Sequence, residues 1–160
     1  AEQMHADDLF LLGTDLVKDQ NVLEAAYNDT RGVTAAFNRN ILRIINRKLE
    51  GDFQPADFRH QALYNRRESQ IEMHLVAERD HTVHLREPDL TVPFREGEAV
   101  RTEISRKYTR PMVEQMLRSA GLELLEWHTD PKEYFALSVS RLQEGASGNS
   151  RHNGAINRSR

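Results

Sequence analysis

The stretch LFLLGTD (Leu9–Asp15) places four consecutive apolar residues directly before a glycine and two residues that favour turns. A continuous apolar run of this kind predicts a fully buried strand, as found at the centre of a parallel sheet. The strand begins close to Ala1, so we expect earlier neighbours in that sheet to lie upstream of these 160 residues.

Two helices are predicted after this strand. Asp19 can cap a helix over residues 21–27, because its carboxylate can accept a hydrogen bond from an unpaired amide of the first turn. Helical spacing of apolar residues predicts a second helix over residues 33–49, which Gly51 ends. Its buried stripe is expected to consist of Val33, Ala36, Phe37, Ile41, Ile44 and Ile45.

Strand-like alternation follows the helices. Apolar and polar residues alternate at 71–75, 82–85 and 90–92, which predicts an antiparallel meander with one solvated face. Pro93 is expected to stop the third strand, because proline cannot donate to a ladder. A longer strand is predicted over residues 100–108.

A helix and two strands are predicted near the end of the chain. Thr109 and Pro111 can start the helix, and Gly121 can close it. Strands over residues 122–127 and 135–139 follow, separated by turn-forming residues. The last residues are Gly, Ser, Asn and Arg with little to bury, so the tail over 142–160 is expected to be disordered.

Composition excludes several classes of function. A net charge of −3 argues against nucleic acid or an acidic membrane surface as the main partner. The chain has no cysteine, which excludes disulfides and thiolate metal sites and is compatible with a cytoplasmic location. No apolar run approaches the roughly 18 residues of a membrane span.

Glu103 and Ser105 form the most interesting pair of polar residues. Residues two apart on a strand share a face and lie roughly 6.5 Å apart. A carboxylate there can accept the N–H of a neutral imidazole while a hydroxyl donates to the other ring nitrogen. The alternative is a plain solvated strand face, since Arg101 and Lys107 share it.

Three further residues are candidates for a site. Tyr27 lies on the apolar side of its helix and could hydrogen-bond a substrate carboxylate, or it could be an ordinary core tyrosine with a satisfied hydroxyl. Met73 could line a ligand pocket or simply fill the core. Asn40 falls on the apolar stripe of the second helix, where a buried amide would serve either the structure or a site.

The histidines do not predict a metal site. His81 and His84 are three residues apart, which on a strand points them to opposite faces. Glu72 and His74 share a face but lack an evident third ligand. Glycine-rich phosphate-binding loops and hydrolase motifs are also absent from the sequence.

Several segments in order resemble the histidine-specific methyltransferase family of ergothioneine biosynthesis. The similarity is carried by LLGTDLVKD (11–19), GVTAAFNRN (32–40), IEM (71–73), RTEIS (101–105), WHTDP (127–131) and FALS (135–138). It spans residues 9–140, almost all of the chain outside the polar tail.

The resemblance implies an α/β fold, with a partial class I (Rossmann-like) methyltransferase sheet and an inserted α+β substrate-binding domain. Residues 1–17 and 108–141 would belong to the methyltransferase core, and residues 18–107 would form the inserted domain. The family's cofactor loop would lie upstream of Ala1. We therefore expect these 160 residues to be inactive alone and the complete enzyme to be a monomer.

The resemblance also implies a reaction, the trimethylation of the α-amino group of L-histidine to hercynine with S-adenosylmethionine as donor. Tyr27, Glu103 and Ser105 match residues that contact histidine in the family, and Met73 matches a residue that lines the pocket. No residue of this chain matches a cofactor ligand. Two alternatives stay open: a related methyltransferase acting on another small amine, and a non-catalytic fragment of the substrate domain.

Overall fold

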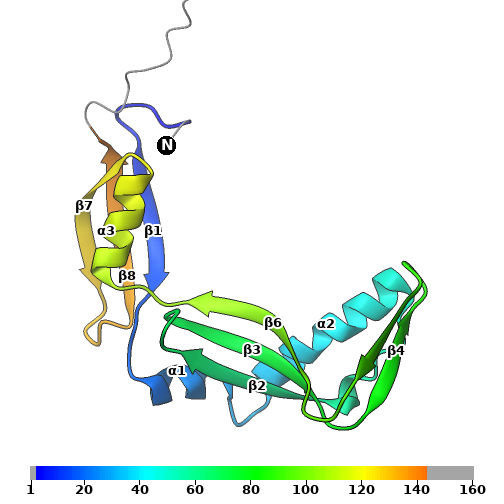
Figure 1. Ribbon diagram of the computed structural model, residues 1–160. Helices are drawn as coiled ribbons and strands as arrows, with labels where there is room; N and C mark the ends of the chain where they lie inside the picture. The colour runs from blue at the N-terminus through cyan, green and yellow to red at the C-terminus, as the bar shows by residue number, and fades with distance from the viewer. Residues whose placement is uncertain (1–2, 144–160) are drawn as a thin grey trace, which may run out of the picture. The chain divides into compact units, whose positions relative to one another are not determined.

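The computed structural model describes residues 3–143, and its contacts divide the chain into two units (Figure 1). The middle unit is Asp15–Tyr108. The terminal unit combines Ala1–Thr14 with the residues from Thr109 onward. Each unit contains both helix and sheet, and each is described by itself.

The terminal unit is a three-stranded sheet with one helix packed on it (Figure 1). Its elements are β1 (Leu9–Asp15), α3 (Arg110–Ser119), β7 (Leu122–Thr129) and β8 (Phe135–Leu142). The strand order is β1-β8-β7, and β7 and β8 form an antiparallel pair. The last strand therefore lies between the first strand and the strand that precedes it in sequence. Val113 and Leu117 are the buried residues of α3.

The first strand does not lie where the sequence predicted. Within residues 3–143, β1 is at the edge of its sheet, and Leu9 and Leu11 are each 64% exposed. Its inner side is tightly packed, because a Cβ atom on Gly13 would lie only 2.8 Å from the Phe135 ring. The prediction of a fully buried central strand is thus wrong for the described part of the chain.

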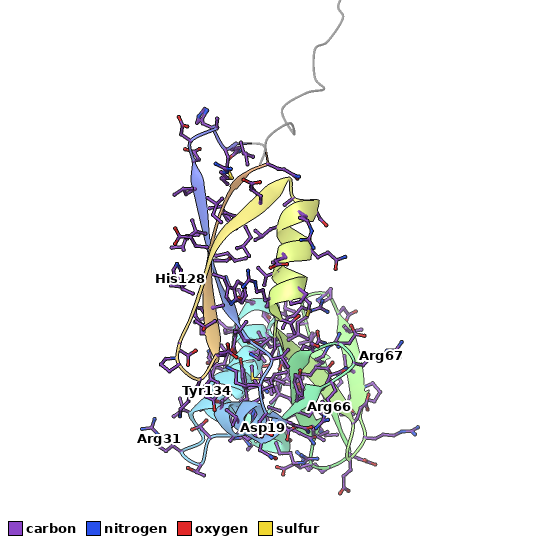
Figure 2. All side chains as sticks on the ribbon, turned by 90° about the vertical axis from the view of Figure 1, so that its left-hand side faces the viewer. Asp19, Arg31, Arg66, Arg67, His128 and Tyr134 are labelled. Carbon is purple, nitrogen blue, oxygen red and sulfur yellow. The ribbon has the colours of Figure 1, made fainter. Side chains whose placement is uncertain are left out.

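The middle unit contains two helices, a three-stranded sheet and a hairpin. Its elements are α1 (Gln20–Tyr27), α2 (Val33–Leu49), the 3-10 turn η1 (Pro55–Asp57), β2 (Phe58–Asn65), β3 (Gln70–Ala77), β4 (His81–Leu85), β5 (Leu90–Phe94) and β6 (Ala99–Arg106). The antiparallel sheet has the order β2-β3-β6, and β4 pairs with β5 alone. In Figure 2 the side chain of Arg67, in the turn between β2 and β3, points away from the unit.

The predicted meander is correct for the antiparallel pair of β4 and β5 and wrong for β3, which pairs with β2 and β6 instead. Strand β2 was not predicted, and it takes one edge of β3 while β6 takes the other. Because β3 is central, both of its faces are covered, and even Glu72 is buried on the face expected to be solvated. Pro93 does not stop β5, which continues to Phe94; proline is tolerated there because the strand is an edge.

Helix α2 has the predicted bounds but not the predicted buried face. Leu42 and Asn38 are the buried residues, with Ile45 and Leu49 packed beside the core. Most of the predicted stripe faces outward, and Phe37 is 65% exposed. The left-handed residue at the end of the helix is Glu50 rather than a glycine.

Two apolar clusters stabilise the middle unit. The larger one joins α2, the start of β2 and the β4–β5 hairpin, and comprises Leu42, Phe53, Phe58, Leu75, Ala77, Val83, Leu85 and Phe94. The smaller one lies under α1 and comprises Leu23, Ala62, Ile71 and Met73, with Tyr27 and Tyr64 against it. The second cluster fixes α1 on the sheet face that carries the candidate site.

The chain enters and leaves the middle unit at one point. The Tyr108 amide donates to the Asp15 carbonyl (2.9 Å), and the Val17 amide donates to the Tyr108 carbonyl (3.0 Å). These bonds make a parallel bridge between Leu16 and Tyr108. The predicted boundaries, 18–107, are a few residues inside this closure.

Three remaining sequence predictions concern the last strand, the tail and the absence of a membrane span. Strand β8 continues to Leu142, beyond the predicted end at 139. The predicted disordered tail lies, from residue 144 onward, outside the described residues. Among residues 3–143, no helix is long and apolar enough to span a membrane.

Candidate functional site

The predicted site residues of β3 and β6 lie on one face of the central sheet. Met73 is the partner of Glu103 in the antiparallel register, and Ile71 is the partner of Ser105. Directly paired residues point to the same side of a sheet. Met73 is buried against Leu23 of α1, so the apolar cluster forms a floor beside the two polar residues.

Helix α1 brings Tyr27 to the same place. The Tyr27 hydroxyl lies 2.9 Å from Ser105 Oγ, across 78 residues of sequence. The helix begins at Gln20, where the Asp19 carboxylate accepts from the Asn21 amide as the sequence predicted. At its other end, Asn28 makes two hydrogen bonds with the Ala62 backbone, which hold the last turn against β2.

Glu103 is exposed beside this pair. Among the described residues, its carboxylate makes no hydrogen bond or ion pair. A carboxylate is a pure acceptor when ionised. The structure therefore presents an accessible acceptor at Glu103 and a hydroxyl at Ser105, two residues apart on one strand face.

Lys107 holds the site together, although the sequence did not single it out. Its side chain is 0% exposed, and its ammonium donates to Asp15 Oδ2 (2.7 Å), Ser105 Oγ (2.8 Å) and the Tyr27 hydroxyl (2.9 Å). The ammonium also lies 4.8 Å from the centre of the Tyr27 ring. The alternation of Glu103, Ser105 and Lys107 placed the lysine on this face, but a charged side chain on a strand ordinarily indicates solvation.

The solvated-face alternative rested on Arg101 as well, and Arg101 points elsewhere. A bulge between Met73 and His74 shifts the register, so Arg101 is the partner of His74. Its guanidinium lies 3.5 Å from Glu72 on the opposite face. The face with Glu103 and Ser105 therefore carries a buried ammonium rather than two exposed cations.

The charges in this network are stable near neutral pH. Burial lowers the pKa of Lys107, but hydrogen bonds to Asp15 and Tyr27 outweigh it, so the pKa is raised above its usual value. Burial likewise raises the pKa of Asp15, and hydrogen bonds from Lys107 and Lys18 more than offset it, so that pKa is lowered. Both groups are therefore ionised, and Lys107 is a permanent cation behind Ser105.

Comparison with known proteins assigns this chain to a family. Residues 1–142 match the family model described as "Histidine-specific methyltransferase, SAM-dependent". The chain belongs to the histidine-specific, S-adenosylmethionine-dependent methyltransferases.

Two curated relatives carry the name histidine N-alpha-methyltransferase. The protein from Mycobacterium tuberculosis is 47% identical over 137 residues, covering 86% of this chain and 43% of the relative. The one from Mycolicibacterium smegmatis is 45% identical over 140 residues, covering 88% of this chain and 44% of the relative. The chain thus spans less than half the length of these two methyltransferases.

Two glycines of the described residues leave no room for a cofactor to approach the backbone closely. A nucleotide-like cofactor usually rests against glycines, where the backbone can approach it closely. Here the space beside Gly13 and Gly51 is filled by protein side chains, since a Cβ atom on either glycine would lie 2.8 Å from Phe135 or 2.7 Å from Leu85, respectively. Gly32 has nothing within 4 Å. We assign no residue of 3–143 to S-adenosylmethionine.

A second polar network lies beside the site, on the same face of the sheet as Met73. The Asn38 amide donates to His60 Nδ1 (2.9 Å) and the His74 carbonyl (3.1 Å), and accepts from the Thr102 hydroxyl (2.6 Å). His60 Nε2 lies 2.8 Å from the Tyr27 carbonyl, which can only accept, so the ring is protonated at Nε2.

The buried amide of α2 is therefore not the one that the sequence indicated. Asn40 is exposed, while Asn38 is 3% exposed and joins α2 to all three strands of the sheet. As for metals, no three His, Cys, Asp or Glu side chains gather to hold an ion within residues 3–143.

Proposed function

We propose that this chain supplies the histidine-binding part of an enzyme that trimethylates the α-amino group of L-histidine. S-adenosylmethionine would be the donor and hercynine, the betaine that precedes ergothioneine, the product. Family membership and the names of the two relatives support the reaction. The observation that supports histidine binding by this chain is that Glu103 and Ser105 lie on one strand face beside Tyr27.

The pair is complementary to one neutral imidazole ring. Glu103 accepts the ring N–H, and Ser105 donates to the other ring nitrogen. Met73 packs under the ring as part of the apolar floor. Anchoring the ring fixes where the α-amine lies, which is the main contribution that a binding domain makes to a transfer reaction.

The two units have different roles in this proposal. The middle unit is the substrate domain, inserted at the point where Asp15 meets Tyr108. The antiparallel β7–β8 hairpin that follows α3 in the terminal unit supports placing this unit at the end of a class I methyltransferase sheet. We propose that the complete enzyme is a cytoplasmic monomer and that these 160 residues alone do not methylate histidine.

Replacing Glu103 by glutamine tests the imidazole assignment. The amide oxygen can still accept the ring N–H but carries no charge, so this hydrogen bond weakens and KM for histidine in the complete gene product should rise about tenfold, about 1.4 kcal/mol of binding. Steady-state methylation assays measure this. Glu78→Gln, an exposed carboxylate in the turn after β3, is the matched control and should behave as wild type.

A substrate panel separates the two alternatives. A methyltransferase for another small amine would turn over a second amino acid faster than histidine. A non-catalytic chain would show no turnover with any amine, even in the complete gene product. An unchanged KM for histidine in Glu103→Gln would overturn the role of Glu103.

A further inference from the structure

Lys107 fixes the direction of the hydrogen bonds around it. An ammonium has three N–H donors and no acceptor. Its three neighbours are the Asp15 carboxylate, the Tyr27 hydroxyl and the Ser105 hydroxyl, all within 2.9 Å. Both hydroxyl oxygens must therefore accept from Lys107, and none of the ammonium protons is left for a ligand.

The Tyr27–Ser105 pair then has one proton to offer. The two hydroxyl oxygens are 2.9 Å apart, so one of them donates to the other. A phenol is the stronger donor, so Tyr27 donates to Ser105. Ser105 Oγ now accepts from Tyr27 and Lys107, which fills both of its lone pairs. Its own proton is left for the ligand; with the opposite direction, the free proton would be that of Tyr27.

The ligand must match this donor and the acceptor at Glu103. A neutral imidazole brings one N–H and one lone pair, and so satisfies both. An imidazolium brings two N–H groups and no lone pair. One of these two N–H groups would point at the hydroxyl proton of Ser105. The positive charge of the ring would also lie near the Lys107 ammonium behind Ser105.

We infer that Lys107 is a positioning residue that makes the Tyr27–Ser105 pair a hydrogen-bond donor, so that the site binds the neutral form of an imidazole and rejects the imidazolium. The inference rests on the proposed histidine-binding function and adds a specificity rule to it. Lys107 does not touch the ligand; it acts through Ser105 and Tyr27.

Other titratable groups lie around the pair and must be separated from the ligand's own titration. They are Asp15 and Lys18 before α1, Glu24 and Tyr27 on α1, His60 and Tyr64 on β2, and Glu103 and Lys107 on β6. The facing residues of β3, Ile71 and Met73, are apolar. A ratio between two ligands cancels the titration of all these protein groups.

The two ligands are L-histidine and 1,2,4-triazolyl-3-alanine, whose ring also offers an N–H and a lone pair but stays neutral throughout the range. Calorimetry on the complete gene product gives Kd for each at pH 8 and pH 5. With a side-chain pKa near 6.5, only about 3% of histidine is neutral at pH 5. Its affinity should fall roughly thirtyfold relative to that of the triazole.

Lys107→Met should reduce this thirtyfold contrast to less than about threefold, because Ser105 can then also accept and the cation is gone. Lys48→Met is the matched control, since Lys48 is an exposed lysine in the last turn of α2, and the contrast should persist. If Lys107→Met does not fold, Tyr27→Phe frees one lone pair on Ser105, and the contrast should shrink at least threefold.

The outcomes separate the inference from the function beneath it. Histidine binding with equal pH dependence for both ligands would overturn the selection of the neutral ring and leave the proposed function standing. If folded Lys107→Met still shows a thirtyfold loss of histidine affinity relative to the triazole between pH 8 and pH 5, the role of Lys107 is overturned. Failure of the wild-type protein to bind or methylate histidine at any pH would instead overturn the proposed function.

Discussion

Asn38 shows how much one buried amide contributes at the scale of the residue. Its side chain makes hydrogen bonds to His60, the His74 carbonyl and Thr102, which join α2 to β2, β3 and β6. A buried polar group that loses its partner costs about 1–3 kcal/mol. Removing Asn38 leaves several such groups unpaired at once, including His60, which bonds the Tyr27 carbonyl.

We therefore predict that Asn38→Ala lowers the free energy of unfolding by about 3 kcal/mol or more. Asn40→Ala is the matched control, since Asn40 is exposed on the same helix, and it should change stability by less than about 0.5 kcal/mol. Urea unfolding followed by circular dichroism measures both. Equal effects of the two changes would show that the network contributes little.

Part of the candidate site could be predicted from the sequence. The period of two along a strand was enough to place Glu103 and Ser105 on one face. It also placed Lys107 there, but a lysine on a strand is usually solvated, and nothing local shows its partners. Asp15 and Tyr27 lie 92 and 80 residues away from it in sequence. Only the fold brings them together.

Among the elements, helix α2 carries two apolar stripes on different faces. Its buried face follows Asn38 and Leu42, and a second apolar stripe of Val33, Phe37, Ile41 and Ile44 is exposed. The second stripe was predicted to be the buried one because it holds more apolar residues. Counting apolar residues does not identify the buried face of a helix when that face contains a polar residue such as Asn38.

Paired substitutions on α2 should show which face carries stability in the 160-residue chain. Leu42→Ala should cost about 2–4 kcal/mol, because Leu42 is only 5% exposed in the larger apolar cluster. Phe37→Ser should cost less than about 0.5 kcal/mol, because Phe37 is 65% exposed. Denaturant midpoints compare the two variants. A larger loss in Phe37→Ser would mean that the exposed stripe is covered.

Strand prediction succeeded where alternation was clean and failed where it was not. The bounds of β3, β4 and β6 follow their alternation closely, and β7 and β8 follow the turn residues between them. Strand β2 mixes arginine, histidine and glutamine with its apolar residues, because its inward side carries His60, the partner of Asn38. Because β2 was not predicted, the neighbours of β3 in the sheet were also predicted wrongly.

In the molecule as a whole, the backbone bonds that close the middle unit determine which segment of the chain can be expressed alone. The backbone bonds between Asp15, Val17 and Tyr108 bring its two ends together. The Asp15 carboxylate is also the counter-ion of Lys107. The predicted boundaries, 18–107, omit both the closing bonds and this carboxylate, whereas residues 15–108 include them.

We predict that residues 15–108 expressed alone fold cooperatively and are more stable than residues 18–107. Breaking a buried ion pair leaves an uncompensated charge and costs roughly 3–5 kcal/mol; the loss here should lie at the low end, because Asp15 is about one-third exposed. Thermal unfolding of both segments measures the difference. A third segment, 15–108 with Asp15→Asn, keeps the closing backbone bonds and lacks only the charge. If the closure alone stabilises the unit, this segment should match 15–108; if the counter-ion of Lys107 is what matters, it should unfold near the midpoint of 18–107.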